Sequence, residues 1–404
     1  MKKFDVPVTY RSGFISRVKE IRKIRDPRKQ DFSPTILDFD KLTLVLPRHF
    51  GFCYGVENAI ERSFKAIREN PGKRIFLLSE MIHNPAINED LLSSGLKFIF
   101  DTSGHQLIGW DDITREDIVI IPAFGTTLEI EAKLNEIGAI TESYNTTCPF
   151  VEKVWKRSAE IGREGFSVVI HGKFKHEETR ATFSHSNKNS PSVIVRDMRE
   201  AELLAEYIRG HRNASEFESD FAGKCSDGFD VQQDLKKLGV VNQTTMLATE
   251  TEEITQFLRS VMMELHGEKW MHFFADTRDT LCYATHDNQQ STVSAAETGA
   301  AMALVVGGYN SSNTSQIADI LAQSMPTFFI RDAEEIMDGN SIQHFDYPAQ
   351  ELKITHGWLP VEGQRKVIVT SGASCPDSIL DGVIQRLLEV SACQMHCDDA
   401  LNQL

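Results

Sequence analysis

Short apolar runs that alternate with amphipathic helical stretches constrain the fold of this chain more than any other feature. Each run ends in a polar or glycine-containing loop, and a helical pattern follows. This alternation is typical of parallel β-sheets covered by helices, so we expect an α/β fold. The expected strands lie at 42–47, 74–80, 117–123, 166–172, 240–245, 301–308 and 366–374. Because ligands bind beyond the carboxyl ends of such strands, the loops after them should hold the functional residues.

The length of 404 residues is enough for two or three compact domains. The pattern predicts α/β domains at 41–146, 147–280 and 281–378. A polar insertion is expected near 211–232, inside the second domain, and a closing helix and tail at 379–404.

Residues 1–40 form a basic N-terminal extension on a chain whose net charge is −15. Phe14, Val18, Ile21 and Ile24 recur at helical spacing, and Pro27 should end that helix. Two interpretations are open. The helix lies on the protein's own body, or the segment is a docking arm for an acidic partner such as an electron carrier.

Charge and hydropathy limit the class of protein. The acidic balance argues against nucleic-acid binding over the whole chain. No apolar run approaches the ~18–20 residues of a membrane-spanning helix, and the first residues lack the apolar segment of a secretory signal. Seven scattered cysteines do not form the pattern of a disulfide framework. We therefore expect a cytoplasmic protein without nucleic-acid or membrane partners.

Three cysteines each come directly before an expected helix, namely Cys53, Cys148 and Cys282. A helix N-terminus favours a thiolate, although each cysteine alone could equally be a small buried residue in a turn. Their occurrence in three α/β units indicates one shared centre. Three protein thiolates would hold a 4Fe–4S cluster and leave its fourth iron open to substrate. The clustered cysteine spacing of a ferredoxin is absent, which argues against a cluster for electron transfer alone.

A histidine and a carboxylate follow the strand expected at 166–172. His176 and Glu178 belong to the sequence HEET, which we place in a loop at the end of that strand. An imidazole and a carboxylate in such a loop can bind an anion and deliver a proton. Solvated surface residues are an equally good interpretation of this motif by itself.

Short hydrogen-bond donors follow the strand expected at 301–308. Ser311, Ser312 and Asn313 come after two glycines, as in a phosphate cradle at a helix N-terminus. An ordinary helix cap is the alternative, but three consecutive donors exceed what one cap requires. Comparable loops supply His83, Thr244 and Ser374. Few lysines or arginines accompany these donors and no GxxxxGK[ST] or GxGxxG motif is present, which indicates a small diphosphate and not a nucleotide.

Together these motifs resemble the IspH or LytB family, the 4-hydroxy-3-methylbut-2-enyl diphosphate reductases of the non-mevalonate isoprenoid pathway. Over about residues 42–380 the family's motifs occur in the family's order: GFCYGV, HNP, TTCP, HEET, NQTT, CYAT, NSSN and SGAS. The long middle insertion is similar to that of the cyanobacterial and plastid branch. The resemblance implies a trefoil of three pseudo-symmetric α/β domains, with mostly parallel sheets, around a central iron–sulfur cluster.

The resemblance also implies roles for individual residues. The cluster ligands would be Cys53, Cys148 and Cys282. The diphosphate would be bound by His83, His176, Ser311, Ser312, Asn313 and Ser374. Glu178 matches the acid that starts the proton relay to the substrate hydroxyl, and Thr244 matches a hydroxyl beside it.

The implied reaction removes the substrate hydroxyl with two electrons and two protons and gives isopentenyl and dimethylallyl diphosphates. A ferredoxin- or flavodoxin-like electron donor is implied, because the cluster passes electrons singly. Phe124 stands where the family commonly has a histidine, and a phenyl ring cannot donate a hydrogen bond. The diphosphate then has one donor fewer, or another residue supplies it. Two other classes stay open: an iron–sulfur lyase or dehydratase acting on another small anionic substrate, and a non-catalytic diphosphate-sensing module.

Overall fold

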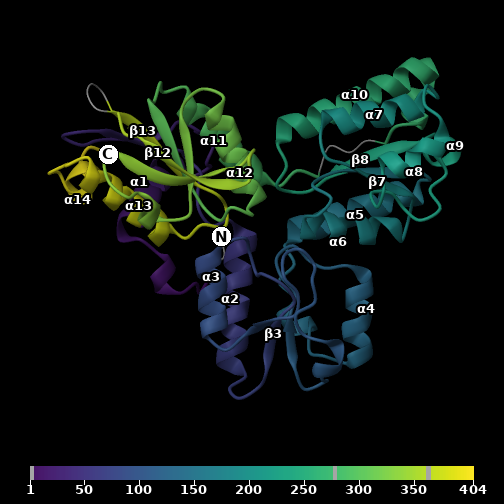
Figure 1. Cartoon of the computed structure of the whole chain (residues 1–404), viewed down its shortest axis with the longest axis horizontal. Coiled ribbons are helices and arrows are strands. Elements are labelled where there is room, and N and C mark those ends of the chain that lie inside the picture. The colour runs from purple at the N-terminus through teal and green to yellow at the C-terminus, as the bar shows by residue number, and fades with distance from the viewer. Residues whose placement is uncertain (1–3, 276–279, 361–364) are drawn as a thin grey trace. The chain divides into compact units, whose positions relative to one another are not determined.

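The computed structural model describes residues 4–275, 280–360 and 365–404. The chain divides into two compact units (Figure 1). The first unit comprises Met1–Glu57, His83–Asn88 and Tyr283–Leu404, and the second comprises Asn58–Ile82 and Glu89–Cys282. Most neighbouring strands in both units run parallel, which confirms the expected α/β class.

The first unit is built on a five-stranded sheet. Its strands, in spatial order, are β1 (Thr35–Asp38), β2 (Thr43–Leu46), β13 (Lys366–Ser371), β9 (Met302–Val306) and β10 (Thr327–Ile330). Its helices are α1 (Gly13–Arg25), α11 (Tyr283–Ala296), α12 (Ser312–Ala322), α13 (Asp377–Val390) and α14 (Cys397–Leu401). A hairpin of β11 (Ser341–Asp346) and β12 (Glu351–His356) completes it. The helices α2 (Tyr54–Glu69) and α3 (Pro85–Ser93) contribute residues to both units.

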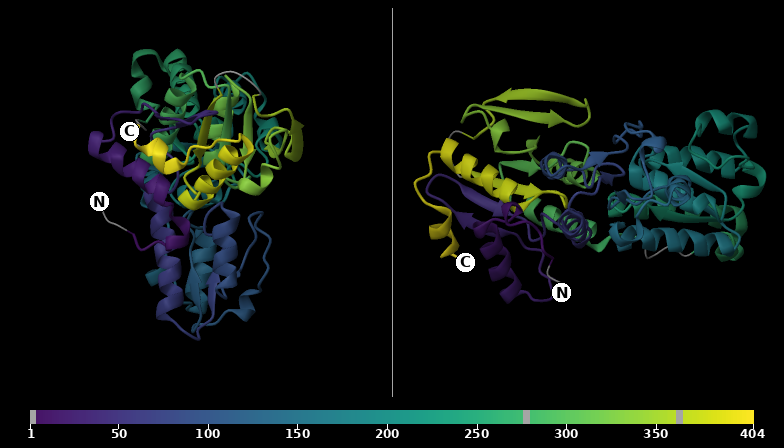
Figure 2. Two further views of the ribbon diagram at one scale, coloured as in Figure 1. Left: turned by 90° about the vertical axis from the view of Figure 1, so that its left-hand side faces the viewer. Right: turned by 90° about the horizontal axis from the view of Figure 1, so that it is seen from below.

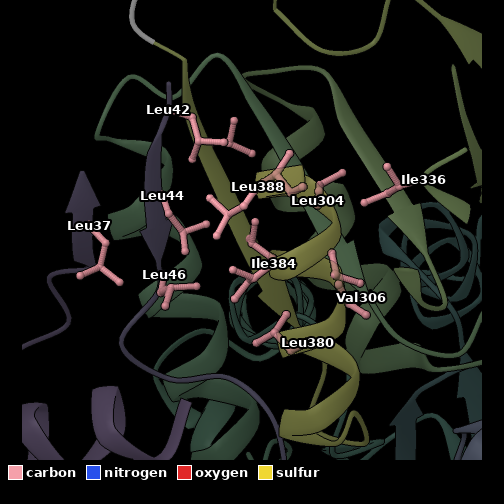
Figure 3. Packing of buried hydrophobic residues seen from close by; sticks show 14 of the residues in the cluster. Leu37, Leu42, Leu44, Leu46, Leu304, Val306, Ile336, Leu380, Ile384 and Leu388 are labelled. Atoms are coloured by element: carbon pink, nitrogen blue, oxygen red, sulfur yellow. The ribbon is translucent and has the colours of Figure 1, made fainter. Parts of the chain in front are cut away.

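Alternate residues of these strands enter two different cores, because successive side chains of a strand point to opposite faces. Leu44 and Leu304 pack with Ile384 of α13 in one core, and Figure 3 shows these side chains directed toward one another. Their neighbours Val45 and Ala303 belong to the core on the other face, which α11 and α12 cover. A sheet buried on both faces requires nearly continuous apolar strands, which is the pattern that the sequence shows.

The basic N-terminal extension is part of the first unit. Its helix α1 ends two residues before Pro27, as expected, and buries Phe14 and Val18 in the core that α13 and α14 line. Both views of Figure 2 show α1 beside these two helices. The hydroxyl of Ser12 donates to Asp381 of α13 at 2.6 Å. The interpretation of a helix lying on the protein's own body is confirmed.

The second unit contains two three-stranded parallel sheets. One has the order β4 (Lys97–Phe98), β3 (Ile75–Leu77), β5 (Ile118–Ile120), and the other β7 (Ser192–Val195), β6 (Ser167–His171), β8 (Leu238–Asn242). The helices are α4 (Leu128–Ile137), α5 (Pro149–Arg163), α6 (Glu177–Asn187), α7 (Met198–Ile208), α8 (Phe217–Asp220), α9 (Val231–Asp234) and α10 (Ala248–His266). Figure 1 shows α7 and α10 on one side of the β6 sheet and α5 and α6 on the other.

Two features differ from the expectations. We grouped the strand at 42–47 with those at 74–80 and 117–123, but β2 pairs with β1 and β13, because its side chains complete the core under α13. The polar insertion at 211–232 is packed and partly helical. Its Phe217 and Phe221 are buried and stack on each other with ring centroids 4.8 Å apart. No helix among the described residues is both long and apolar enough to cross a membrane.

Candidate functional site

Glu178 lies at the carboxyl ends of two neighbouring parallel strands in the second unit. The strands β6 and β8 are in register at their last residues, so the loops after them start side by side. Glu178 lies in the first turn of α6, the helix that follows β6, and not in a loop as we expected; it is 2% exposed. Its two carboxylate oxygens accept hydrogen bonds from Thr244, which follows β8: one from the backbone N–H at 2.5 Å and one from the hydroxyl at 3.0 Å. The structure thus brings the two expected catalytic residues together.

Gln243 joins the same two loops. Its side-chain oxygen accepts from the backbone N–H of Lys173 and from the hydroxyl of Thr179, both at 3.0 Å. Its side-chain amide donates to Thr245 at 2.6 Å. Gln243 is fully buried, so these bonds fix the loop before α6 and the first turn of α6, which carries Glu178, without help from solvent.

The imidazole of His176 begins helix α6. Its Nδ1 accepts a hydrogen bond from the backbone N–H of Glu178 at 3.1 Å, so His176 is the N-cap of the helix. A ring nitrogen that accepts cannot carry a proton, which places the proton of the neutral ring on Nε2 as a donor. The ring of Phe124 meets the imidazole edge to face, with centroids 5.7 Å apart. Phe124 therefore supports the orientation of His176 although it offers no donor itself.

A second group of expected residues lies at strand ends in the first unit. The ends of β9 and β13 are in register, and the loops after them contain Ser311 to Asn313 and Ser374. The side-chain oxygen of Asn313 accepts from the backbone N–H of Ala373 at 2.8 Å, which ties one loop to the other. Ser311 caps α12 through its hydroxyl.

Two donors of this group are buried without an acceptor. Ser312 Oγ and Asn313 Nδ2 belong to residues that are 3% and 4% exposed, and neither atom has a hydrogen-bond partner within the described residues. Buried polar atoms are seldom left unsatisfied in folded proteins, so such atoms indicate a missing ligand. Both lie in the first turn of α12, where backbone N–H groups and the helix dipole favour an anion.

His83 approaches these loops through its backbone. Its carbonyl oxygen accepts from the hydroxyl of Ser374 at 3.2 Å. The same oxygen lies only 2.5 Å from the place that a Cβ atom would take on Gly308, so only glycine allows the approach. The structure thus places His83 with Ser311, Ser312, Asn313 and Ser374.

We did not single out Tyr309 from the sequence, although it fixes the loop after β9. Its hydroxyl donates to Glu335 at 2.5 Å, and Glu335 also accepts from Nε of Arg331 at 3.0 Å. The Tyr309 ring stacks on Phe345 of β11, with centroids 4.4 Å apart. Burial and the carboxylate raise the pKa of Tyr309, so its hydroxyl stays a donor. Its position in the loop between Gly308 and Ser311 was the only available signal.

The three cysteines expected as ligands form no disulfide and are partly exposed. Each directly precedes a helix: Cys53 precedes α2, Cys148 caps α5 and Cys282 precedes α11. The backbone N–H of Cys53 donates to Ala373 at 3.3 Å, beside the anion-binding loops. The backbone N–H of Cys148 donates to Ala123, next to Phe124, at 3.0 Å.

The cysteines divide between the units. Cys53 lies in the first unit, and Cys148 and Cys282 lie in the second. Within the ranges that the structure describes, no three or more His, Cys, Asp or Glu side chains are grouped so that they could hold a metal ion. Cys375 differs from the three, since it is completely buried and burial raises the pKa of its thiol. It is unsuited to ligation for that reason.

Comparison with solved structures supports the fold. The chain matches the structure of the E-1-hydroxy-2-methyl-but-2-enyl-4-diphosphate reductase from Plasmodium falciparum with a TM-score of 0.62 and 20% identity, over 86% of this chain and 88% of that one. A structure of (E)-4-hydroxy-3-methyl-but-2-enyl diphosphate reductase matches with a TM-score of 0.51 and 23% identity, over 86% of this chain and 99% of that one.

Sequence comparison gives relatives of higher identity from Prochlorococcus and Synechococcus. The 4-hydroxy-3-methylbut-2-enyl diphosphate reductase of Prochlorococcus marinus (strain MIT 9301) is 36% identical over 95% of this chain and 96% of its own length. The 4-hydroxy-3-methylbut-2-enyl diphosphate reductase of Synechococcus sp. (strain WH7803) is 39% identical over 88% of this chain and 87% of its own length. The family model of the LytB protein matches residues 44–388. The chain belongs to the LytB family, which the motifs from GFCYGV to SGAS had indicated.

Proposed function

We propose that this chain reductively removes the hydroxyl of 4-hydroxy-3-methylbut-2-enyl diphosphate and releases isopentenyl and dimethylallyl diphosphates. The observation that carries the proposal is the pair of buried, unsatisfied donors at the start of α12, Ser312 Oγ and Asn313 Nδ2. They suit a compact polyanion, and the named relatives are reductases of this diphosphate. His83, Ser311 and Ser374 lie in the same group of loops and complete the proposed diphosphate site.

The proposed proton donor is Glu178. An allylic hydroxide is a poor leaving group, so protonation of its oxygen lowers the barrier to C–O cleavage. Each carboxylate oxygen of Glu178 accepts one bond from Thr244, which holds the carboxyl group in a fixed orientation. The Thr244 hydroxyl can accept from the substrate hydroxyl while it donates to Glu178. His176 offers its Nε2 proton to the diphosphate.

The chemistry of the donor set fits an iron–sulfur cluster. Cys53, Cys148 and Cys282 form no disulfide, are partly exposed and lie at helix N-termini, where the dipole favours the thiolate that iron requires. We assign these three residues as ligands of a 4Fe–4S cluster, surrounded by three domains at 41–146, 147–280 and 281–378. When bound, the cluster supplies single electrons and an open iron for the substrate oxygen.

The balance of the reaction defines the electron source. The C–O bond breaks, a C–H bond forms, and two electrons and two protons yield one water and one dehydroxylated diphosphate. A ferredoxin- or flavodoxin-like protein would supply the electrons one at a time. We place the reaction in the cytoplasm, which agrees with seven cysteines that form no disulfide.

The experiment that tests the function is an anaerobic titration with a reduced one-electron dye. The purified protein receives a known amount of the hydroxylated diphosphate, and dye oxidation is compared with product measured by mass spectrometry. Two equivalents of dye per product are expected. Turnover without any reductant would instead identify a lyase, and binding without turnover would identify a diphosphate-sensing module.

A further inference from the structure

An exposed cationic surface covers the end of α1 and the turn after it. Lys23, Arg25 and Arg28 are all exposed. None of the three forms an ion pair within the described part of the chain. The same helix uses other cations internally, since Arg17 pairs with Asp398 at 2.7 Å. The unpaired cations are therefore a distinct set that the fold itself does not need.

The turn that carries part of this surface is fixed. The two carboxylate oxygens of Asp26 accept from the backbone N–H groups of Gln30 at 3.1 Å and Asp31 at 3.0 Å. Its backbone oxygen accepts from the N–H of Lys29, which adopts a φ of 55°. A non-glycine residue in this left-handed region needs such local support. The cations consequently stand on a preorganised surface, unlike those of a flexible basic tail.

The surface rests on the loop that leads to Cys53. Arg48 begins that loop, is 7% exposed and donates to the backbone oxygen of Asp26 at 3.4 Å. The ring of Phe32 meets that of His49, the next residue, with centroids 5.6 Å apart. The cationic turn and the cysteine loop are thus in direct contact within one unit.

Positive charge is in excess at this place. Burial and the nearby Arg48 lower the pKa of Lys29, and burial and Arg22 lower the pKa of Arg48. Burial is the largest cause of both shifts, and repulsion by a neighbouring cation adds to it in each. The side chain of Ile24 is 74% exposed between Lys23 and Arg25. An apolar residue inside a ring of charges is a frequent composition of a protein–protein interface.

We propose that Lys23, Ile24, Arg25 and Arg28 form the docking site of an acidic protein that carries single electrons. The inference rests on the proposed function, because that reaction consumes two electrons and needs a donor. Electron transfer between proteins requires that the two redox centres approach closely, and the turn that carries part of this surface contacts Arg48 and His49 in the loop that leads to Cys53. On a chain of net charge −15, a local cationic surface would also steer an acidic donor to this one place.

The test reverses these charges in the anaerobically purified full chain. K23E/R25E/R28E is compared with K97E/K236E/K269E, which changes the net charge equally at exposed lysines of the second unit. The triple neutral variant K23Q/R25Q/R28Q guards against misfolding, because glutamate is unfavourable in the last turn of α1.

The probes are an acidic [2Fe–2S] ferredoxin and reduced methyl viologen, a dye that needs no protein interface. At low salt we expect the charge-reversal variant to raise both KM for ferredoxin and the Kd measured by calorimetry by about tenfold or more. The neutral variant should raise both quantities by less. In the control variant K97E/K236E/K269E, KM and Kd for ferredoxin should stay within about twofold of the wild-type values. Added salt should shrink the difference, because it screens exposed charges. With methyl viologen all variants should match the wild type.

Three results would overturn the proposal. The first is an equal rise of KM and Kd in the control variant, and the second is an equal loss of turnover with methyl viologen in the charge-reversal variant. The third is binding of anionic phosphatidylglycerol vesicles that the charge reversal abolishes while KM for ferredoxin stays unchanged. Failure of the proposed function looks different. In that case the wild type would not turn over with methyl viologen, whatever its affinity for ferredoxin.

Discussion

Replacing Glu178 by glutamine separates proton transfer from folding. The carboxylate accepts two bonds from Thr244, at 2.5 and 3.0 Å. Glutamine keeps one oxygen for the backbone N–H, and the Thr244 hydroxyl can rotate to accept from the new amide. Both bonds are thus retained in number, and we expect the free energy of unfolding to change by less than about 1 kcal/mol.

The turnover rate should respond much more strongly, because an amide cannot deliver the proton. General acid catalysis contributes about 100- to 10,000-fold, so kcat of Glu178→Gln should fall by roughly that factor. KM should change little, because the unsatisfied diphosphate donors belong to α12. The matched control is Glu177→Gln, since Glu177 is the neighbouring buried glutamate on the same helix.

The measurement is dye-driven anaerobic turnover together with thermal unfolding of both variants. Glu177→Gln should stay within about fivefold of the wild-type kcat. The assignment of Glu178 would be refuted by a Glu178→Gln variant that keeps more than a tenth of wild-type kcat. An equally slow Glu177→Gln variant would refute it as well.

Three further predictions concern the first unit. Asn313→Asp keeps the acceptor for the backbone N–H of Ala373 but turns the unsatisfied donor into an anion. KM for the diphosphate should therefore rise by about 100-fold or more, and an unchanged KM would exclude a diphosphate contact at this residue. Tyr309→Phe removes one hydrogen bond to the buried carboxylate of Glu335 and should raise KM for the diphosphate about five- to tenfold with kcat nearly constant. The control is Tyr207→Phe, which loses a similar bond to a carboxylate in the second unit and should lower the stability of the fold without changing KM. Burial, assisted by the nearby arginine, lowers the pKa of His49 to about 4, so its ring should titrate near that pH by NMR and not near 6.5. The unfolded chain then takes up the proton first, and the folded state should lose stability as the pH falls from 6.5 toward 4, an effect that His49→Gln should reduce.

Local patterns were enough to predict the elements that carry the site. The strand predicted at 166–172 is β6, and His176 ends the loop after it, but Glu178 lies in the first turn of α6 and not in that loop as expected. Pro149 occupies the first position of α5 and Cys148 its N-cap, which is where proline and a preceding loop residue belong. Continuous apolar strands predicted a parallel sheet covered on both faces, and the cores on the two faces of the five-stranded sheet confirm it.

Pairings between distant segments were beyond such patterns. The short β1 within the basic extension is a strand because β2 offers it an edge, and β2 in turn pairs with β13, more than 300 residues further along the chain. The bond between Tyr309 and Glu335 depends on β9 and β10 ending side by side. The insertion appeared polar because its few aromatic residues, such as Phe217, are scattered, and only folding gathers them into one core.

The proposed reaction depends above all on one cluster held by three cysteines that each precede a helix. The direct test is the iron and sulfide content of anaerobically purified protein with Cys53, Cys148 or Cys282 changed singly to serine. The controls are Cys225→Ser and Cys393→Ser, which alter two other free, partly exposed thiols. About four irons and four sulfides per chain are expected in the wild type and both controls, and a large loss in each of the three variants. A wild type without iron, or three variants that keep the full content, would contradict the account.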